Sequence, residues 1–316
     1  MKQFTSIDDI DNLTELLKLA AKIKQNPYNY KYLGKDKTLC LLFFNPSLRT
    51  RLSTQKAALN LGMNTLVLNL NNESWAIEIE IGSIMNKGTQ EHIKEAARVI
   101  SSYCDVIGIR TFAGMTNKIE DYKELILNKF ISYATVPIIS LESATLHPLQ
   151  SLADLMTIEE QKKKSKIKVV LTWVPHSRSL PQAVANSFAE WVSKSDVEFV
   201  IANPPGFNLS KKYTKNALVT HNQNEALKEA DFVYSKNWSS YENYGEIGND
   251  FNNWMITKEK LKLTAKAKFM HCLPIRRNVV ASDAVIDSKD SLVIEQANNR
   301  TFAAQSVLFK LLQNEK

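Results

Sequence analysis

Serine, threonine and two arginines gather within five residues, in the order Ser47-Leu48-Arg49-Thr50-Arg51. An apolar run at residues 38–44 precedes them and predicts a buried parallel strand. Pro46 breaks this strand, Ser47 takes an N-cap position, and Gly62 can close the helix that follows. Backbone N–H groups, the positive end of a helix dipole, hydroxyls and guanidinium groups then converge at the helix start. This combination predicts binding of an anion, specifically a phosphate.

The alternative for this stretch is an ordinary solvated helix start, where serine and arginine are common. Two features favour the phosphate. The turn follows the carboxyl end of a predicted central strand, which is where open α/β sheets bind ligands. The chain also has only nine glycines in 316 residues, with no Gly-x-x-x-x-Gly-Lys or Gly-x-Gly-x-x-Gly segment, so no glycine-rich cradle competes for a phosphate.

Arg110 and His147 are further candidates at predicted element ends. Arg110 follows the strand predicted at residues 105–109, where it can anchor an anion or a developing oxyanion. The alternative is an ordinary surface arginine. His147 precedes Pro148, which suits a first helical position. A helix N-terminus lowers a histidine pKa, so a neutral imidazole there can donate a hydrogen bond to a carbonyl, although a structural cap fits the position equally well.

Charged and thiol side chains follow other predicted strands. His271 and Cys272 end an apolar strand, but neighbouring strand residues point to opposite faces, which argues against a cysteine–histidine nucleophile pair. His176 and Lys236 follow two more strands of the second half, and Glu142 ends one of the first half. These residues predict a second, charged substrate that is bound by both signs. The five histidines and three cysteines show no metal-ligand spacing, so neither a metal nor another cofactor is predicted.

Composition limits the classes of protein. Forty Lys and Arg against 33 Asp and Glu give a net charge of +7, which suits an acidic small substrate. No apolar run reaches the roughly 18 residues needed to span a bilayer, and the start lacks the apolar core of a signal peptide. Three scattered cysteines do not form a disulfide framework, so a cytoplasmic location is expected. No basic stripe interleaved with aromatic residues indicates nucleic-acid binding.

The elements that must position these residues alternate between strand and helix in both halves. Strands are predicted at residues 38–44, 65–70, 105–109, 137–140, 168–173, 197–202, 231–234 and 268–272. Helices are predicted at residues 7–24, 47–61, 91–102, 122–129, 149–163, 180–192, 224–229 and 296–313. The pattern predicts an α/β fold of two Rossmann-like domains with parallel sheets and an inter-domain cleft. The polar stretch 237–253, which has few apolar anchors, is predicted to be a mobile loop that closes over a site.

Three segments resemble the motifs of one enzyme family. Ser47-Leu48-Arg49-Thr50-Arg51 resembles the Ser-x-Arg-Thr-Arg motif of the aspartate/ornithine carbamoyltransferase superfamily. His147-Pro148-Leu149-Gln150 resembles its His-Pro-x-Gln motif, and His271-Cys272-Leu273-Pro274 the His-Cys-Leu-Pro motif of its ornithine-type members. The likeness covers nearly the whole chain. It implies carbamoyl transfer to an amine in arginine biosynthesis, a homotrimer with shared active sites, and a knotted C-terminal domain.

The resemblance also implies domains and residue roles. Residues 1–147 would bind carbamoyl phosphate, residues 148–295 would bind an N-acylated ornithine, and the last helix, 296–316, would pack back on the first domain. Carbamoyl phosphate would be bound by Ser47, Leu48, Arg49, Thr50, Trp75 from a neighbouring subunit, Arg110, His147, Gln150, Cys272, Leu273 and Arg300. Thr50, Arg110 and His147 would polarise its carbonyl, and Cys272 would orient the δ-amine without attacking. The acceptor would be bound by Glu142, His176, Lys236, Arg277 and Gln90.

Further segments resemble the branch that uses N-acylated ornithine. Glu73-Ser74-Trp75 matches its tryptophan segment, and the Ser-Met-Gly motif that holds a free α-amino group is missing. Members that use N-acetylornithine carry a Glu where this chain has Gln90 and a modified Lys where it has Val280. Members that use N-succinylornithine have apolar residues at both places.

Val280 therefore favours the succinyl group. Gln90 departs from both patterns but removes a charge that would repel a succinyl carboxylate, and Arg277 is expected to pair with that carboxylate. The expected acceptor is N-succinylornithine. The alternatives are N-acetylornithine, another amine, or a non-catalytic anion-binding role.

Overall fold

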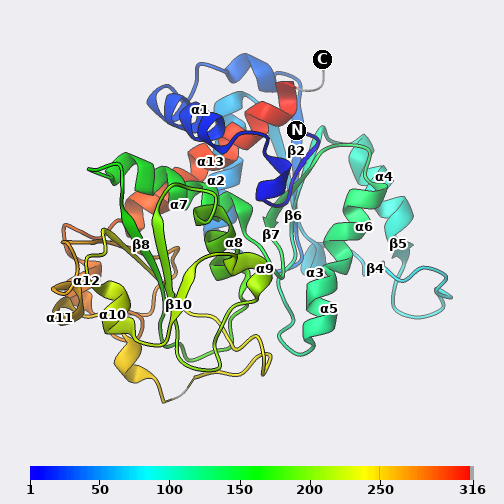
Figure 1. Ribbon diagram of the computed structural model, residues 1–316. Coiled ribbons are helices and arrows are strands. Elements are labelled where there is room, and N and C mark those ends of the chain that lie inside the picture. The colour runs from blue at the N-terminus through cyan, green and yellow to red at the C-terminus, as the bar shows by residue number, and fades with distance from the viewer. Residues whose placement is uncertain (249, 314–316) are drawn as a thin grey trace. The chain divides into compact units, whose positions relative to one another are not determined.

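The computed structural model describes residues 1–248 and 250–313, and the chain divides into two compact units (Figure 1). The first unit comprises Met1–Ala113, Ile119–Leu149 and the chain from Arg300 onward, and the second comprises Gly114–Lys118 and Gln150–Asn299. Three helices have residues in both units, namely α5 (Lys118–Lys123), α7 (Pro148–Gln161) and α13 (Val293–Gln313). The main division lies between residues 149 and 150. The division predicted from the sequence lies two residues earlier, between 147 and 148.

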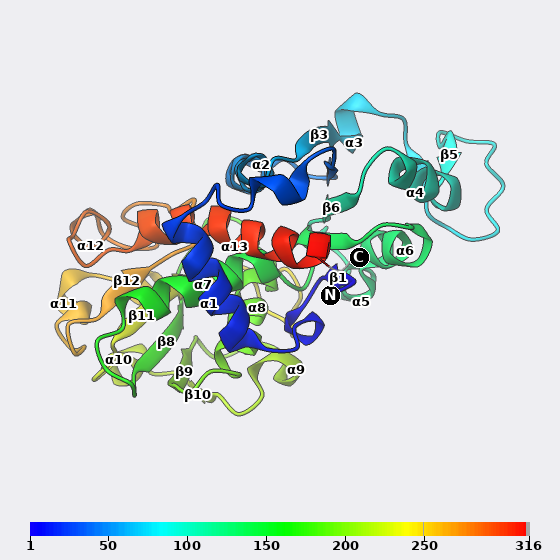
Figure 2. The same ribbon diagram turned by 90° about the horizontal axis from the view of Figure 1, so that it is seen from above.

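A parallel five-stranded sheet forms the centre of the first unit, in the order β1-β7-β6-β2-β3. Its strands are β1 (Gln3–Phe4), β2 (Thr38–Phe43), β3 (Asn64–Asn69), β6 (Val106–Arg110) and β7 (Ile138–Glu142). The accompanying elements are η1 (Ile7–Asp9), α1 (Leu13–Gln25), η2 (Lys31–Gly34), α2 (Leu48–Leu61), α3 (Leu70–Glu73), the paired β4 (Ile77–Glu78) and β5 (Glu91–His92), α4 (Ile93–Ser102), α5 (Lys118–Lys123) and α6 (Leu125–Tyr133). Figure 2 shows α4 and α6 next to each other beside this sheet.

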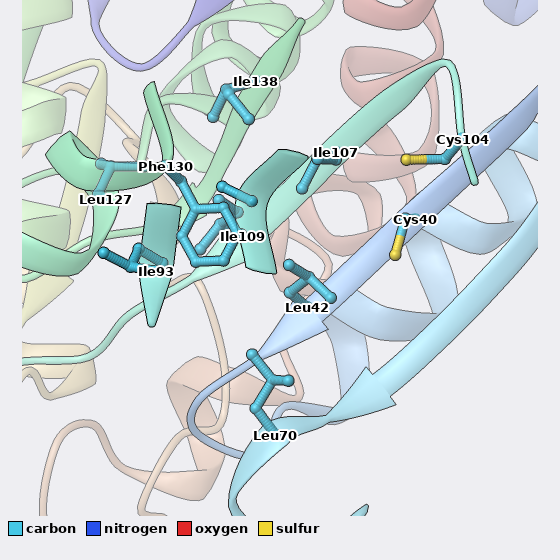
Figure 3. Close-up of a cluster of buried hydrophobic side chains, with 11 residues drawn as sticks. Cys40, Leu42, Leu70, Ile93, Cys104, Ile107, Ile109, Leu127, Phe130 and Ile138 are labelled. Atoms are coloured by element: carbon cyan, nitrogen blue, oxygen red, sulfur yellow. The ribbon is translucent and has the colours of Figure 1, made fainter. Parts of the chain in front are cut away.

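Alternate residues of the two central strands of this sheet face one apolar core (Figure 3). Leu42 of β2 and Ile107 and Ile109 of β6 are fully buried, and they pack with Ile93 of α4 and Phe130 of α6. The other face of these strands is buried as well, because their burial is continuous and does not alternate. Polar side chains can therefore lie only at the strand ends, which is where the candidate residues occur.

The second unit has its own parallel sheet, in the order β10-β9-β8-β11-β12. Its strands are β8 (Lys168–Trp173), β9 (Glu198–Ala202), β10 (Leu218–Thr220), β11 (Phe232–Lys236) and β12 (Lys268–Met270). Besides its share of α7 and α13, the unit contains α8 (Ala183–Val192), α9 (Lys211–Thr214), α10 (Gln223–Leu227), η3 (Asn252–Trp254), α11 (Lys258–Leu261) and α12 (Asp283–Ile286).

The strand order reverses once in each sheet, and ligands bind α/β sheets at such reversals. In the first sheet the reversal separates β2 from β6, whose last paired residues are Phe43 and Arg110. In the second it separates β8 from β11, which end together at Trp173 and Lys236. The predicted α/β class with parallel sheets in two domains is thus confirmed, and the knotted path stays a prediction.

Some predicted elements differ from the structure. The helix expected at residues 7–24 begins at Leu13, because the Asn12 side chain caps it by accepting a hydrogen bond from the Glu15 N–H at 3.1 Å. The stretch 237–253 is better anchored than predicted: Trp238 is fully buried, and its Nε1 donates to the Phe207 carbonyl at 2.8 Å. Asn249 of this stretch lies outside the described residues.

Within residues 1–248 and 250–313, no helix combines the length and the apolar character that crossing a membrane requires.

Candidate active site

The helix after β2 begins as the sequence predicts. Ser47 is the N-cap residue of α2 with an extended backbone (φ −151°, ψ 126°), and its hydroxyl makes no capping hydrogen bond. Gly62 ends the helix at φ 86°, a conformation that glycine adopts without steric cost. The first turn therefore presents backbone N–H groups and an uncommitted hydroxyl at the positive end of a 14-residue helix, which favours an anion.

Arg300, which lies near the end of the chain, contacts this turn. Arg300 of α13 donates from Nη2 to the Oγ1 of Thr50 at 2.5 Å, and both side chains are buried. A further bond between the same helices, from Asn60 Nδ2 to Gln305 Oε1 at 3.0 Å, fixes α13 against α2. The fold thus places Arg300 beside a residue 250 positions earlier in the chain.

Arg110, the last residue of β6, is buried and almost fully occupied. Its Nε and Nη2 donate to one carboxylate oxygen of Glu142, at 3.1 and 2.8 Å. Its Nη1 donates to the backbone carbonyls of Asn45 and Pro46, both at 3.0 Å. Since a guanidinium has five N–H donors, one donor on Nη2 is left for a further acceptor. Arg110 therefore fixes the turn before Ser47 as well as carrying charge.

His147 lies next to this ion pair and is neutral at ordinary pH. Its Nε2 is 3.9 Å from the Glu142 carboxylate. Burial lowers the pKa of His147 to about 3. The Glu142 carboxylate acts to raise this pKa, and Arg300 and Arg110 act to lower it further. Burial acts to raise the pKa of Glu142, but His147, Arg110 and Arg300 together hold it below the ordinary value. Because the imidazole is uncharged, the guanidinium groups compensate the carboxylate. The predicted neutral His147 is thus present, with burial as its main cause.

A clamp that the sequence analysis missed holds the segment before His147. Glu124, in the left-handed conformation at φ 47°, accepts hydrogen bonds from the Ser143 hydroxyl and from the Thr145 N–H and hydroxyl, the latter two at 2.9 and 2.7 Å. The Ser143 N–H in turn donates to the Leu146 carbonyl at 2.8 Å. This short loop joins β7 to α7, so Glu124 sets the spacing between Glu142 and His147.

Trp75 and Gln90 lie at the two ends of one exposed loop, away from the buried cluster. The pairing of β4 with β5 brings the ends together, and the Gln90 N–H donates to the Ala76 carbonyl at 3.1 Å. The Trp75 side chain is 53% exposed, and its Nε1 donates to Glu91 at 2.8 Å. An indole of this size on the surface is an unusual use of apolar area.

In the second unit, Gln150 is buried near the start of α7. Its Nε2 donates to Asp154 Oδ1, one helical turn later, at 2.7 Å. Its Oε1 is buried with no hydrogen-bond partner in the described structure. The side chain therefore offers an acceptor for an N–H donor.

The segment after β12 forms a tight turn. The Leu273 N–H donates to His271 Nδ1 at 2.9 Å, and Leu273 has φ 56°, a left-handed conformation that is costly for a branched side chain. The peptide bond to Pro274 is cis. Cys272 is buried at 8% exposure. Strained backbone of this kind often occurs at ligand sites, where it aims a backbone group.

The predicted acceptor residues of this unit differ in their surroundings. Lys236, at the end of β11, is buried and donates to the Asn237 carbonyl at 2.8 Å. Burial is the main cause that lowers the pKa of His176, and the positive charges of Lys236, Arg276 and Arg178 lower it further. The hydrogen bond of His176 with the Arg178 backbone acts in the opposite direction. Arg276 donates from Nε to His176 Nε2 at 3.0 Å. Lys236 and Arg276 are thus two cations beside His176 at the reversal of the second sheet.

The Arg277 side chain binds two aspartates of its own unit, Asp283 and Asp287. Its guanidinium donates to Asp287 through two bonds of 2.8 and 2.6 Å and to Asp283 through one of 2.8 Å. Asp287 and Asp283 raise its pKa above the ordinary value. Two carboxylates therefore already neutralise the side chain that was predicted to bind a substrate carboxylate.

The structure assembles the predicted residues in two groups. The first unit brings together Thr50, Arg110, Glu142, His147 and Arg300, and the second brings His176 together with Lys236. Sequence reasoning missed Glu124, Asp154 and the role of Arg276. Only Asp154 carried a signal, the i, i+4 spacing from Gln150 on a predicted helix. No group of three or more His, Cys, Asp or Glu in the described part of the chain can hold a metal.

Two parallel α/β units, an open helix start flanked by arginines, and a neutral buried histidine define an enzyme that acts on a small phosphorylated substrate. The family models give the particular class. The model of the aspartate/ornithine carbamoyltransferase carbamoyl-P binding domain matches residues 2–160, and that of the Asp/Orn binding domain matches residues 166–311. The chain belongs to the aspartate/ornithine carbamoyltransferase family, as its motifs predicted, and is a carbamoyltransferase.

Individual relatives cover the whole chain. It is 51% identical over 316 residues to an N-succinylornithine carbamoyltransferase of Bacteroides fragilis, covering 99% of each chain. It is 34% identical over 334 residues to an N-acetylornithine carbamoyltransferase of Xylella fastidiosa, covering 98% of each. A solved N-acetyl-L-ornithine transcarbamylase variant, complexed with carbamyl phosphate and N-succinyl-L-norvaline, has a TM-score of 0.93 at 34% identity, covering 98% of this chain and all of the other.

Proposed function

We propose that this enzyme transfers the carbamoyl group of carbamoyl phosphate to the δ-amine of N-succinylornithine, in arginine biosynthesis. The amine nitrogen attacks the carbonyl carbon, the C–O bond to phosphate then breaks, the amine loses a proton, and N-succinylcitrulline and phosphate leave. The observation that carries the donor half is the open start of α2 beside the buried Arg110–Glu142–His147 cluster. Binding both reactants in line would supply much of the rate gain.

The phosphate of the donor is proposed to be held at the start of α2 in the first unit. Ser47, Arg49, Thr50 and the backbone of Leu48 bind the phosphate, with Arg300 held against Thr50. His147 is neutral, so it is suited to donate an N–H to the carbonyl oxygen, and Arg110 retains one donor for the same oxygen as it becomes an oxyanion.

The carbamoyl NH₂ is proposed to bind the Gln150 Oε1 and the Leu273 carbonyl, and Cys272 to lie near the attacking amine. Arg49→Ala tests the donor half. A loss of roughly 100-fold or more in kcat/KM for carbamoyl phosphate is expected, and unchanged kinetics would contradict it.

The acceptor is proposed to be bound by Glu142, His176, Lys236, Arg277 and Gln90, with a succinyl group preferred. Two lines of support converge. A relative of 51% identity is an N-succinylornithine carbamoyltransferase. Variants of an N-acetyl-L-ornithine transcarbamylase with one glutamate replaced by Ala, Pro or Ser are complexed with N-succinyl-L-norvaline, and this chain has the uncharged Gln90 where acetyl-using members carry Glu.

Val280 supports the same acceptor. The acetyl-using members carry a modified Lys there, whereas here the side chain is 1% exposed and the backbone accepts a hydrogen bond from Ile256. Steady-state assays with N-succinylornithine, N-acetylornithine, ornithine and putrescine test the proposal. N-succinylornithine should give the highest kcat/KM, and preference for a non-acylated amine would refute it.

The arginine that meets the succinyl carboxylate can be identified by a matched pair of variants. Arg277 would have to leave Asp283 and Asp287, whereas the Arg276 side chain makes one hydrogen bond within the described residues, to His176. If Arg277 binds the carboxylate, Arg277→Ala should raise KM for N-succinylornithine at least tenfold more than KM for N-acetylornithine. If Arg276→Ala, and not Arg277→Ala, raises KM selectively for N-succinylornithine, then Arg276 binds the carboxylate and Arg277 has a structural role in the turn.

We propose a cytoplasmic homotrimer in which Trp75 completes the site of a neighbouring subunit. Its support is exposed apolar area in the first unit: Leu48, Leu52 and Leu59 on α2 are 71, 58 and 56% exposed, and Leu66 on β3 is 46% exposed. Mixing inactive Trp75→Ala and Arg49→Ala proteins after dissociation tests this. An equimolar mixture should regain about a quarter of the wild-type sites, with one intact site in each hybrid trimer. No recovery would refute shared sites.

A further inference from the structure

Asp154 is a fully buried carboxylate that is not among the proposed substrate ligands. It lies one turn after Gln150 on α7, and its Oδ1 accepts two hydrogen bonds. One comes from Gln150 Nε2 at 2.7 Å, and the other from Gln296 Nε2 at 2.6 Å. All three side chains are at most 1% exposed.

The first of these bonds decides which way the Gln150 amide faces. The NH₂ end of the amide donates to Asp154 Oδ1 and therefore faces this carboxyl group. The carbonyl end, Oε1, then faces away, and it is buried with no partner. A buried acceptor left without a donor costs about 1–3 kcal/mol. The site is therefore built to receive an N–H group at this atom.

The second bond connects the same carboxylate to the turn after β12. Gln296 Oε1 accepts from the backbone N–H of His271 at 3.0 Å. Two residues later, Leu273 takes the left-handed conformation that aims its carbonyl. One carboxylate thus orients Gln150 directly and, through Gln296, the start of the turn that carries the other acceptor proposed for the carbamoyl NH₂.

A buried phenol completes the surroundings of Asp154. Tyr234 is fully buried, and burial, followed by the effects of Asp154 and Cys272, raises its pKa. The protonated hydroxyl therefore lies beside both the carboxylate and the thiol. Asp154 therefore lies beside two amide NH₂ donors and the Tyr234 hydroxyl.

We infer that Asp154 is a positioning residue that makes this enzyme select carbamoyl phosphate over acyl phosphates with a methyl group in place of the NH₂. This inference rests on the proposed function. A site whose buried acceptors face an NH₂ group rejects an analogue that lacks it, because the acceptors are then left unpaired. The selection depends on Gln150 presenting oxygen, and Asp154 enforces that orientation.

The test compares dissociation constants of carbamoyl phosphate, acetyl phosphate and inorganic phosphate. Asp154→Leu removes the acceptor, so its preference for carbamoyl over acetyl phosphate should fall about 10- to 100-fold, with phosphate binding unchanged. Asp154→Asn keeps one acceptor oxygen and should retain most of the preference. The matched control is Glu160→Leu, which removes a carboxylate of the same helix that accepts from Asn299 at 2.9 Å. A merely structural role for Asp154 would weaken all three ligands alike and would overturn the inference.

A double-variant cycle supplies an independent test. If Asp154 acts through Gln150, Asp154→Asn and Asp154→Leu should change the preference little once Gln150→Ala is present. Fully additive losses in Asp154→Leu and Gln150→Ala would overturn the inference. If Asp154→Leu folds poorly, Asp154→Asn is measured alone, and a loss of preference as large as that of Gln150→Ala would overturn the inference as well, because the retained oxygen should still hold the amide. Failure of the proposed function looks different: the wild-type enzyme itself would then show no preference for carbamoyl phosphate.

Discussion

The neutral, buried His147 predicts a specific loss of stability in mild acid. Its pKa falls from 6.5 to about 3 on folding, because the folded protein buries the ring and the unfolded chain does not. Between these values the unfolded chain binds a proton that the folded chain does not, so stability is complete above pH 6.5 and declines as the pH falls towards 3. Each pH unit in this window is worth about 1.36 kcal/mol, so the fall from 6.5 to 5 removes about 2 kcal/mol.

Urea unfolding at pH 7.5 and pH 5 measures this loss. His147→Gln removes the titrating ring, so the wild type should lose about 2 kcal/mol more than the variant between the two pH values. His221→Gln, which replaces a histidine of the second unit, is the control and should behave as the wild type does. If the units unfold in separate steps, the loss belongs to the step of the first unit. Equal losses in wild type and His147→Gln would refute the assignment of a buried neutral ring.

Three further results are expected. Glu124→Ala removes the hydrogen bonds that fix the loop before His147. We expect kcat/KM to fall about tenfold while the affinity for phosphate stays unchanged. An unchanged kcat/KM would show that the loop keeps its shape without Glu124. Cys272→Ser should retain activity within about tenfold, because the phosphate is the leaving group and no thiol attack is needed, whereas a loss above about 1000-fold would indicate a covalent step. Glu142→Ala should destabilise the protein by about 3–5 kcal/mol in urea unfolding, because Arg110 is left buried without its partner, and Glu142→Ala/Arg110→Ala should recover part of that loss.

The site could be predicted from the sequence where its signals are local. Pro46, Ser47 and Gly62 act within one helix, so the strand, the turn and the helix after it were predicted almost to the residue. The alternation of apolar runs likewise predicted two parallel sheets, because strands buried on both faces need no tertiary information to be recognised.

The parts that could not be predicted depend on contacts between distant segments. The state of His147 was predicted from its place at a helix start, but burial is the larger cause, and burial is a property of the folded unit. Arg277 was predicted to bind the substrate carboxylate, although Arg276 follows the same motif and no local signal separates the two. Only the folded chain shows that Asp283 and Asp287 surround Arg277. Trp238 anchors a stretch that looked unanchored for the same reason, since its partner is Phe207.

The burial of Val280 constrains how acyl preference can change during evolution. A lysine at this position, as acetyl-using members carry in modified form, would enter a packed site that is 1% exposed and lies beside the backbone bond to Ile256. Burying that charge without a partner would cost several kcal/mol, a large share of a typical protein's stability. A single substitution would therefore be lost through instability before any new specificity could be selected. A lysine is therefore accommodated here only after another substitution has opened the site, so packing sets the order of the two changes.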